Sequence, residues 1–167
     1  TAVLVYDRYD VWSISPDGMS GRRITDGAAE QVIHRVASLD RDADGIDLNQ
    51  PLYFTLHGER TKQTGWARMR PGGTAERLLL EDARLWRLTR ADSTDTFAYT
   101  RERFDDAPDW FVGNADLRSA RQVSRLNPFQ QEYAWGRAEL VDFTSATGAS
   151  LQAALLYPAD YDPARKY

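Results

Sequence analysis

Three tryptophans occupy comparable places in strand-like segments of this 167-residue chain. Trp12, Trp66 and Trp110 are each followed by a polar turn and then by a second strand-like segment that contains an arginine. The second segment is centred 12 residues after Trp12, at Ile24, and the other two units have nearly the same spacing. Each unit alone is a small twisted sheet that buries its faces only against its neighbours. We therefore expect two to three related β units.

Strand signals run through the rest of the chain, and helical periodicity is nearly absent. The best helical candidate, 75–87, contains a leucine triplet that suits a buried strand equally well. Near the end, 140–144 and 151–157 flank a Thr-Gly turn and predict a β-hairpin. The sequence predicts an all-β chain, with two to three antiparallel blades of a β-propeller followed by this hairpin. The other predicted strands are 3–6, 11–15, 32–39, 51–56, 65–70, 84–89, 96–101, 110–114 and 121–124.

Composition excludes several classes of protein. The hydrophobic fraction of 42%, with five tryptophans and eight tyrosines, indicates a folded chain. The net charge is −4 and no basic block is present, which argues against nucleic-acid binding. No apolar run has the length of a membrane span. The absence of cysteine removes disulfides, zinc-thiolate sites and thiol nucleophiles, and leaves the redox compartment open.

Several segments, in this order, resemble the prolyl oligopeptidase family of serine peptidases. Residues 9–27, with their Ser-Pro-Asp-Gly turn, look like a blade of that family's propeller, and 97–110 resembles its last blade. The Leu-Asn-Pro-Phe run at 126–129 resembles the exit from the propeller. Residues 139–167 resemble the segment that enters the α/β-hydrolase domain. The resemblance implies a partial β-propeller at 1–126, a crossover linker at 127–138, and at 139–167 the first hairpin of a truncated α/β-hydrolase domain.

The same resemblance implies a longer, periplasmic or secreted protein that hydrolyses short peptides by a Ser-His-Asp mechanism, with access gated by the propeller. The chain begins without methionine and ends just after a new hairpin, so we expect an internal piece of that protein. The family's nucleophile lies in a G-x-S-x-G elbow, which is absent here. We therefore expect a non-catalytic fragment with no catalytic residues and no cofactor, which associates with itself through exposed blade edges. The alternative is a propeller-like binding or scaffold module without a hydrolase partner.

One acidic loop has the beginning of a calcium-binding pattern. Asp40, Asp42 and Asp44, followed by Gly45, form D-x-D-x-D-G, which places hard oxygen ligands at alternate positions. Pro51 stands where the bidentate glutamate is needed. We therefore expect a solvated acidic turn, and calcium binding is the minor alternative.

The remaining candidate residues favour structural roles. His34 and His57 lack a convergent partner in the sequence, so we expect packed or surface histidines. The regularly placed aromatic residues indicate packing between units, and Trp135 is expected to attach the hairpin to the propeller. A turn is expected around Pro108, carrying Asp105, Asp106 and Asp109.

Overall fold

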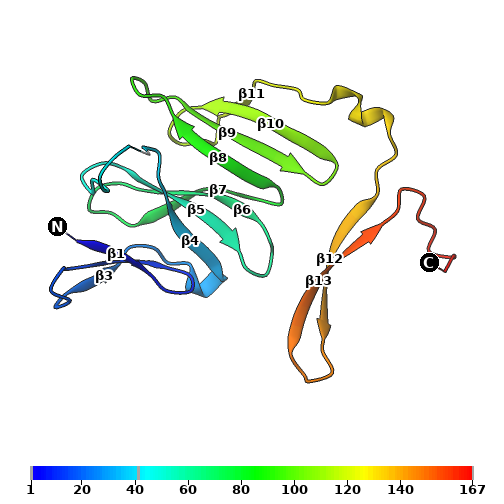
Figure 1. Cartoon of the computed structure of the whole chain (residues 1–167), viewed down its shortest axis with the longest axis horizontal. Coiled ribbons are helices and arrows are strands. Elements are labelled where there is room, and N and C mark those ends of the chain that lie inside the picture. Colours follow the sequence, from blue (N-terminus) through cyan, green and yellow to red (C-terminus); the bar gives the residue numbers. More distant parts are fainter. Residues whose placement is uncertain (1, 41, 167) are drawn as a thin grey trace.

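The structure is a computed structural model that describes residues 2–40 and 42–166, so Thr1, Arg41 and Tyr167 lie outside the described residues. The described chain folds into several antiparallel β-sheets and two short 3₁₀ turns, η1 (Ala28–Glu30) and η2 (Pro128–Glu132) (Figure 1). The all-β prediction is confirmed. The strands are β1 (Val3–Tyr6), β2 (Val11–Ile14), β3 (Gly21–Arg23), β4 (Val32–Ala37), β5 (Leu52–Gly58), β6 (Thr64–Met69), β7 (Ala75–Glu81), β8 (Arg84–Arg90), β9 (Phe97–Arg103), β10 (Asp106–Gly113), β11 (Arg121–Gln122), β12 (Arg137–Thr144) and β13 (Ser150–Tyr157).

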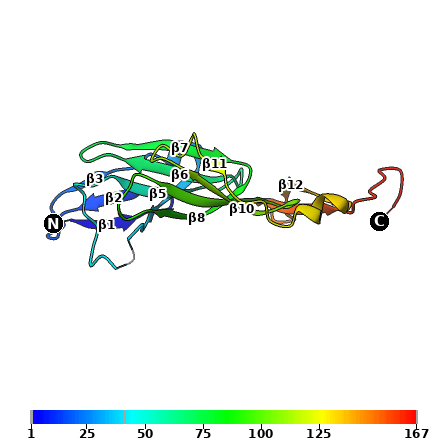
Figure 2. The same cartoon turned by 90° about the horizontal axis from the view of Figure 1, so that it is seen from above.

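Strand order within every sheet follows the sequence. The first sheet is β1-β2-β3, the middle sheet β4-β5-β6-β7, and the third sheet β8-β9-β10-β11. The helical candidate at 75–87 is extended and forms β7 and the start of β8. The predicted hairpin is β12-β13, with Thr144 opposite Ser150 and a turn in which Gly148 has a φ of 83°. Figure 2 shows this hairpin projecting away from the stacked sheets.

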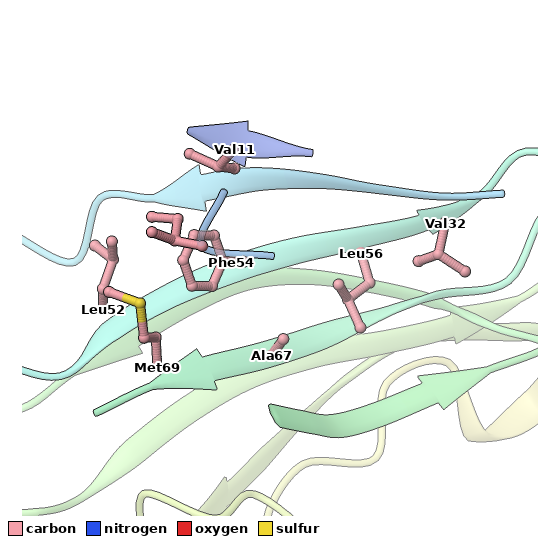
Figure 3. Close-up of a cluster of buried hydrophobic side chains, with 8 residues drawn as sticks. Val11, Val32, Leu52, Phe54, Leu56, Ala67 and Met69 are labelled. Atoms are coloured by element: carbon pink, nitrogen blue, oxygen red, sulfur yellow. The ribbon is translucent and has the colours of Figure 1, made fainter. Parts of the chain in front are cut away.

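The middle sheet buries both of its faces. Phe54 points toward the first sheet, whereas the adjacent Tyr53 points toward the third sheet, as the two-residue period of a strand requires. Figure 3 shows the first of the two resulting cores, between the strand of Val11 and the middle sheet. Burial on both sides explains why β5 reads as an almost continuous apolar run. The first core consists of Val11, Ile24, Val32, Leu52, Phe54, Leu56, Ala67 and Met69.

The second core is closed by the loop between β10 and β11. Leu117 in this loop is fully buried against the middle sheet, although its backbone has a φ of 59°. The carbonyl of Ala115 accepts a hydrogen bond from the Arg68 guanidinium at 3.1 Å. Arg118 donates to the carbonyl of Arg77 at 3.0 Å. The burial and the hydrogen bonds together hold a left-handed conformation that a leucine alone disfavours.

A buried aspartate ties the first sheet to the connection that leaves it. Asp10, at the start of β2, is 1% exposed and accepts hydrogen bonds from the Thr25 hydroxyl at 2.7 Å and the Gly27 N–H at 2.6 Å. The same hydroxyl accepts the N–H of Val11. A Cβ atom on Gly27 would lie 1.9 Å from the carbonyl oxygen of Val32, so glycine is required there.

The third sheet repeats this arrangement. Asp109, which is 4% exposed, accepts from the Ser124 hydroxyl at 2.7 Å and from the Leu126 N–H at 2.8 Å. The Ser124 hydroxyl in turn accepts the N–H of Trp110. We call each such set an aspartate clasp: the aspartate, the hydroxyl and the backbone N–H two residues after the hydroxyl. The expectation of a turn around Pro108 is therefore wrong for Asp109, because both residues lie within β10; Asp105 lies in the exposed β9–β10 turn, and Asp106 begins β10.

The two clasps correct the phase of the tryptophan repeat. They align Asp10 with Asp109, so Val11 corresponds to Trp110. Trp12 therefore lies one position after the residue that corresponds to Trp110. Because successive residues of a strand point to opposite faces, Trp12 lies opposite Val5 on the outer face, away from the first core. Trp66 alone among the three tryptophans is buried between two sheets.

Replacing Asp109 by alanine should lower the free energy of unfolding by about 2–4 kcal/mol, because the polar groups of this clasp would lose the carboxylate that accepts their hydrogen bonds. Asp10→Ala should cost a similar amount. The exposed Asp92→Ala is the matched control and should stay within about 0.5 kcal/mol of the parent chain. Urea denaturation followed by circular dichroism measures all three. Equal stabilities for Asp109→Ala and Asp92→Ala would contradict the role of the clasp.

Candidate functional site

A groove of about 960 Å³ lies where the second and third sheets meet the start of β12. One wall comes from the β5–β6 hairpin, with His57 and Lys62. Another comes from β8 and the β9–β10 turn, with Trp86 and Phe104, and the β12 end contributes Arg137. The groove therefore collects side chains from elements far apart in the sequence.

Two aromatic side chains give this groove exposed apolar surface. Trp86 and Phe104 are each 53% exposed, although both lie beside well-buried residues of the sheets. Phe104 also meets Trp135 edge-on, with ring centroids 6.4 Å apart. Trp135 donates its indole N–H to the carbonyl of Gln130 at 2.8 Å. Trp135 thus links the crossover segment to the turn after β9, and its expected role in attaching the hairpin to a propeller stays a prediction.

Charged groups of both signs surround the aromatic surface. Arg84 forms an ion pair with Glu102 at 2.6 Å and also lies over the ring of Trp86. Arg137 pairs with Glu139 at 3.3 Å. The groove therefore has an apolar centre and a charged rim.

The β12-β13 hairpin is held beside the groove by contacts to one residue. Arg60, in the β5–β6 loop, forms an ion pair of 2.5 Å with Asp142 of β12. The side chain of Gln152 in β13 donates to the carbonyl of Arg60 at 2.9 Å. These contacts join the middle sheet to the hairpin.

The two histidines lie in different surroundings. His57 is exposed in the groove and lies opposite Thr64 across the β5-β6 pair. The Thr64 hydroxyl donates to the carbonyl of Ala83 and accepts the N–H of Leu85, so it is engaged in holding the β7–β8 connection. His34 is buried, with Nδ1 2.9 Å from the Val32 carbonyl oxygen. Burial lowers the pKa of His34, and the nearby carbonyl only partly opposes this effect.

The acidic loop is exposed. Asp42 donates its backbone N–H to a carboxylate oxygen of Asp40 at 3.0 Å, which is the local turn geometry of an aspartate. Among residues 2–40 and 42–166, no three His, Cys, Asp or Glu side chains gather as a metal site would require. Calcium binding by Asp40, Asp42 and Asp44 stays a prediction.

A second cleft, of about 940 Å³, lies under the crossover segment. Its surface includes Arg103, Asp106 and Gln130, together with the clasp residue Asp109. Sequence patterns predicted neither cleft, because each forms between segments that only the packing of sheets brings together. The sequence did not distinguish the exposed aromatic residues of the groove from buried ones, because aromatic residues occupy strand positions on both faces of these sheets.

Within the described part of the chain, the two 3₁₀ turns are too short and no helix has the apolar length for crossing a bilayer.

No family model and no curated protein matches the chain. Solved structures do match. A variant of the AtxE2 isopeptidase with Astexin3-dC4 bound aligns with a TM-score of 0.63 and 13% identity, over 99% of this chain and 25% of that chain. The unliganded AtxE2 isopeptidase aligns with a TM-score of 0.58 and 16% identity, over 92% of this chain and 22% of that chain. The likeness shows a shared fold, and the chain spans about a quarter of the isopeptidase.

These comparisons correct the family assignment. The prediction of a prolyl oligopeptidase family member is wrong, because the structures that the chain resembles are those of the AtxE2 isopeptidase and no family model matches. One of the motifs behind that assignment is the Ser-Pro-Asp-Gly turn of residues 15–18. Its residues are explained by turn geometry: Gly18 has a φ of 72°, and the Ser15 and Asp17 side chains bond to each other.

The buried His34 should make stability depend on pH. Because its pKa is lower in the folded chain than its usual value near 6.5, the unfolded chain binds the proton first as pH falls. The free energy of unfolding should therefore decrease between about pH 7.5 and pH 5.5. The His34→Gln variant should lose this part of the pH dependence, and the exposed His57→Gln should retain it. Urea denaturation at both pH values measures the slope, and identical slopes in the parent chain and His34→Gln would refute the prediction.

Proposed function

We propose that the chain is a non-catalytic, peptide-binding part of a peptidase-related protein, and that the peptide lies in the groove beside the hairpin. One observation carries this proposal: almost the whole chain matches part of an isopeptidase whose structure was solved with Astexin3-dC4 bound. The match supports this proposal through a shared arrangement of sheets, and the groove would provide the surface on which a peptide lies.

The dimensions and chemistry of the groove support a peptide ligand. Its volume of about 960 Å³ is at the upper end for small-molecule pockets, and its open shape suits an extended chain. Trp86 and Phe104 offer apolar area for peptide side chains. Lys62, His57 and Arg103 offer donors to peptide carbonyl or carboxylate groups.

The proposal assigns no catalytic residue to this chain. The sequence contains no G-x-S-x-G elbow. The hydroxyl of Thr64, which lies opposite His57 on the neighbouring strand, is already bonded to two backbone groups. A nucleophile needs a base within hydrogen-bond reach, so catalysis would depend on residues outside this chain.

The architecture of the longer protein is part of the same proposal. Residues 1–126 would form neighbouring units of a propeller-like wall, 127–138 the crossover, and 139–167 the entry to a further domain of the α/β-hydrolase type. The support is the repeated strand order and the repeated aspartate clasp. In addition, both faces of the β12-β13 hairpin carry apolar residues such as Phe143 and Leu156, which a further domain would cover. We further propose that the free strand edges allow self-association.

Binding of fluorescently labelled Astexin3-dC4 to the chain, followed by anisotropy, tests the peptide-binding proposal. Replacing Trp86 by alanine should weaken binding about tenfold, or about 1.4 kcal/mol, because one wall of the groove loses its aromatic surface. Trp12→Ala is the matched control, since Trp12 is on the outer face of the first sheet, and it should bind as the parent chain does. Equal losses for the two variants would argue against the groove.

Prolonged incubation of the same peptide with the chain, analysed by mass spectrometry, tests the absence of catalysis. Intact peptide is the expected result. Cleavage that is removed by His57→Gln would show that the chain carries its own active site and would overturn the non-catalytic assignment.

A further inference from the structure

Three aspartates in this chain are followed directly by glycine, namely Asp17, Asp26 and Asp44. An aspartate in this context is prone to a spontaneous backbone rearrangement, because glycine has no side chain to keep its amide nitrogen away from the preceding carboxyl group. In a folded protein the rearrangement is slow wherever hydrogen bonds fix the glycine nitrogen, since the nitrogen then reacts only when the local structure opens. The three pairs therefore allow a comparison within one structure.

The pair Asp17-Gly18 is fixed within the β2–β3 turn. The N–H of Gly18 donates to the carbonyl of Ser15 at 2.8 Å. The Asp17 carboxylate accepts from the Ser15 hydroxyl at 2.6 Å and from the Met19 N–H at 3.0 Å. These hydrogen bonds lower the pKa of Asp17, which keeps its carboxyl group in the less reactive ionised form. Both reacting groups of this pair are therefore restrained.

The pair Asp26-Gly27 is held by the first aspartate clasp. The N–H of Gly27 donates to the buried carboxylate of Asp10 at 2.6 Å. Asp26 itself forms an ion pair with Arg23 at 3.0 Å. The glycine nitrogen is released only if the clasp opens, and this opening would detach the first sheet from the connection that leaves it.

The third pair has no comparable restraint. Asp44 and Gly45 are exposed in the connection from β4 to β5, which Figure 2 shows extending away from the stacked sheets. In the part of the chain that the structure describes, no atom accepts the N–H of Gly45, and no donor or cation pairs with the Asp44 carboxylate. The hydrogen bonds within this connection hold its two ends, at 38–42 and 47–50.

Gly45 also differs from the other two glycines in what its backbone requires. Gly18 has a φ of 72°, and a Cβ atom on Gly27 would lie 1.9 Å from the carbonyl oxygen of Val32. The φ of Gly45 lies outside the left-handed region, and a Cβ atom there would meet no atom within 4 Å. Alanine can therefore replace Gly45 without strain, so the reactivity of this pair can be altered while the fold is kept.

We propose that Asp44 is a site of isoaspartate formation. The Gly45 nitrogen attacks the protonated side-chain carboxyl group of Asp44 and gives up its proton, the carboxyl hydroxyl leaves as water, and a cyclic imide forms. Water then adds to one of the two imide carbonyls and breaks the bond from that carbonyl to the nitrogen. Opening at the side-chain carbonyl restores aspartate. Opening at the main-chain carbonyl leaves the chain linked through the side chain, as isoaspartate, with a free α-carboxylate. One water leaves and one enters, so the mass is unchanged and no oxidant or reductant takes part.

The product alters the connection and leaves the cores in place. Isoaspartate adds one methylene to the backbone between Leu39, which packs against the second core, and Leu48, which packs against the first. The new α-carboxylate lies in an exposed loop, and it is the group that isoaspartate methyltransferases modify. The modified chain is therefore a substrate for that class of enzyme. This inference does not depend on peptide binding in the groove.

Incubation of the full 167-residue chain near neutral pH, followed by peptide mapping with electron-transfer mass spectrometry, tests the proposal. A sample unfolded in guanidinium chloride gives the reference rate of each pair. In the unfolded sample all three pairs should rearrange at similar rates. In the folded chain Asp44 should react at least about tenfold faster than Asp17 or Asp26, because their glycine nitrogens are held by hydrogen bonds.

Substitutions test the role of the third pair directly. Gly45→Ala should slow the rearrangement about tenfold, because alanine restricts the backbone and crowds the attacking nitrogen, and the midpoint of urea denaturation should not fall. Asp44→Glu should abolish labelling by an isoaspartate methyltransferase. Asp42→Glu is the matched control, since Asp42 lies in the same connection and is followed by alanine, and it should be labelled as the parent chain is.

Two results would overturn the proposal. The first is a folded chain that stays unmodified at Asp44 over the period in which the unfolded sample is converted. The second is conversion of Asp17 or Asp26 in the folded chain as fast as that of Asp44, because the hydrogen bonds to their glycine neighbours would then have no protective effect.

Discussion

The requirement to bury both faces of the middle sheet governs the rest of this structure. A sheet that is apolar on two sides needs a layer on each side, and the first and third sheets supply these layers. The β10–β11 loop of the third sheet packs against the middle sheet. In this loop Leu117 has a left-handed backbone conformation, and its side chain fills part of the second core. The cost of that conformation, on the order of 1–2 kcal/mol, is comparable with the gain from burying a leucine side chain, so the loop keeps its geometry only while the sheets stay stacked.

The strands could be predicted from the sequence because most of them follow the two-residue period or form short apolar runs. The predicted hairpin and nearly all predicted strands agree with the structure within one to four residues at their ends. The phase of the repeat was harder to predict, since tryptophan is the most visible residue but a shift of one position changes the face. A better signal was available: Asp10 and Asp109 are both followed by a hydroxyl residue 15 positions later, at Thr25 and Ser124. This spacing could not be interpreted from the sequence alone, because two polar residues 15 positions apart do not show that the aspartate is buried until the fold is known.

The groove could not be predicted, because its walls come from three parts of the chain that meet only after the sheets stack. The family resemblance did not compensate for this. It depended on short segments, among them the Ser-Pro-Asp-Gly turn, and turn residues recur wherever the backbone needs the same geometry. What the chain shares with the isopeptidase is an arrangement of sheets at 13–16% identity.

The consecutive order of strands also bears on how the chain folds. Sheet proteins usually fold slowly, because pairing distant strands requires the closure of long loops before any contact forms. In each sheet of this chain, every strand pairs with its immediate neighbour in sequence, so a sheet grows by zipping one hairpin after another. On this order of events, contacts between sheets would form by docking of units whose strands are already paired. The slow step should therefore be the assembly of layers rather than the formation of strands, and a defect in one sheet should delay docking without preventing its neighbours from forming.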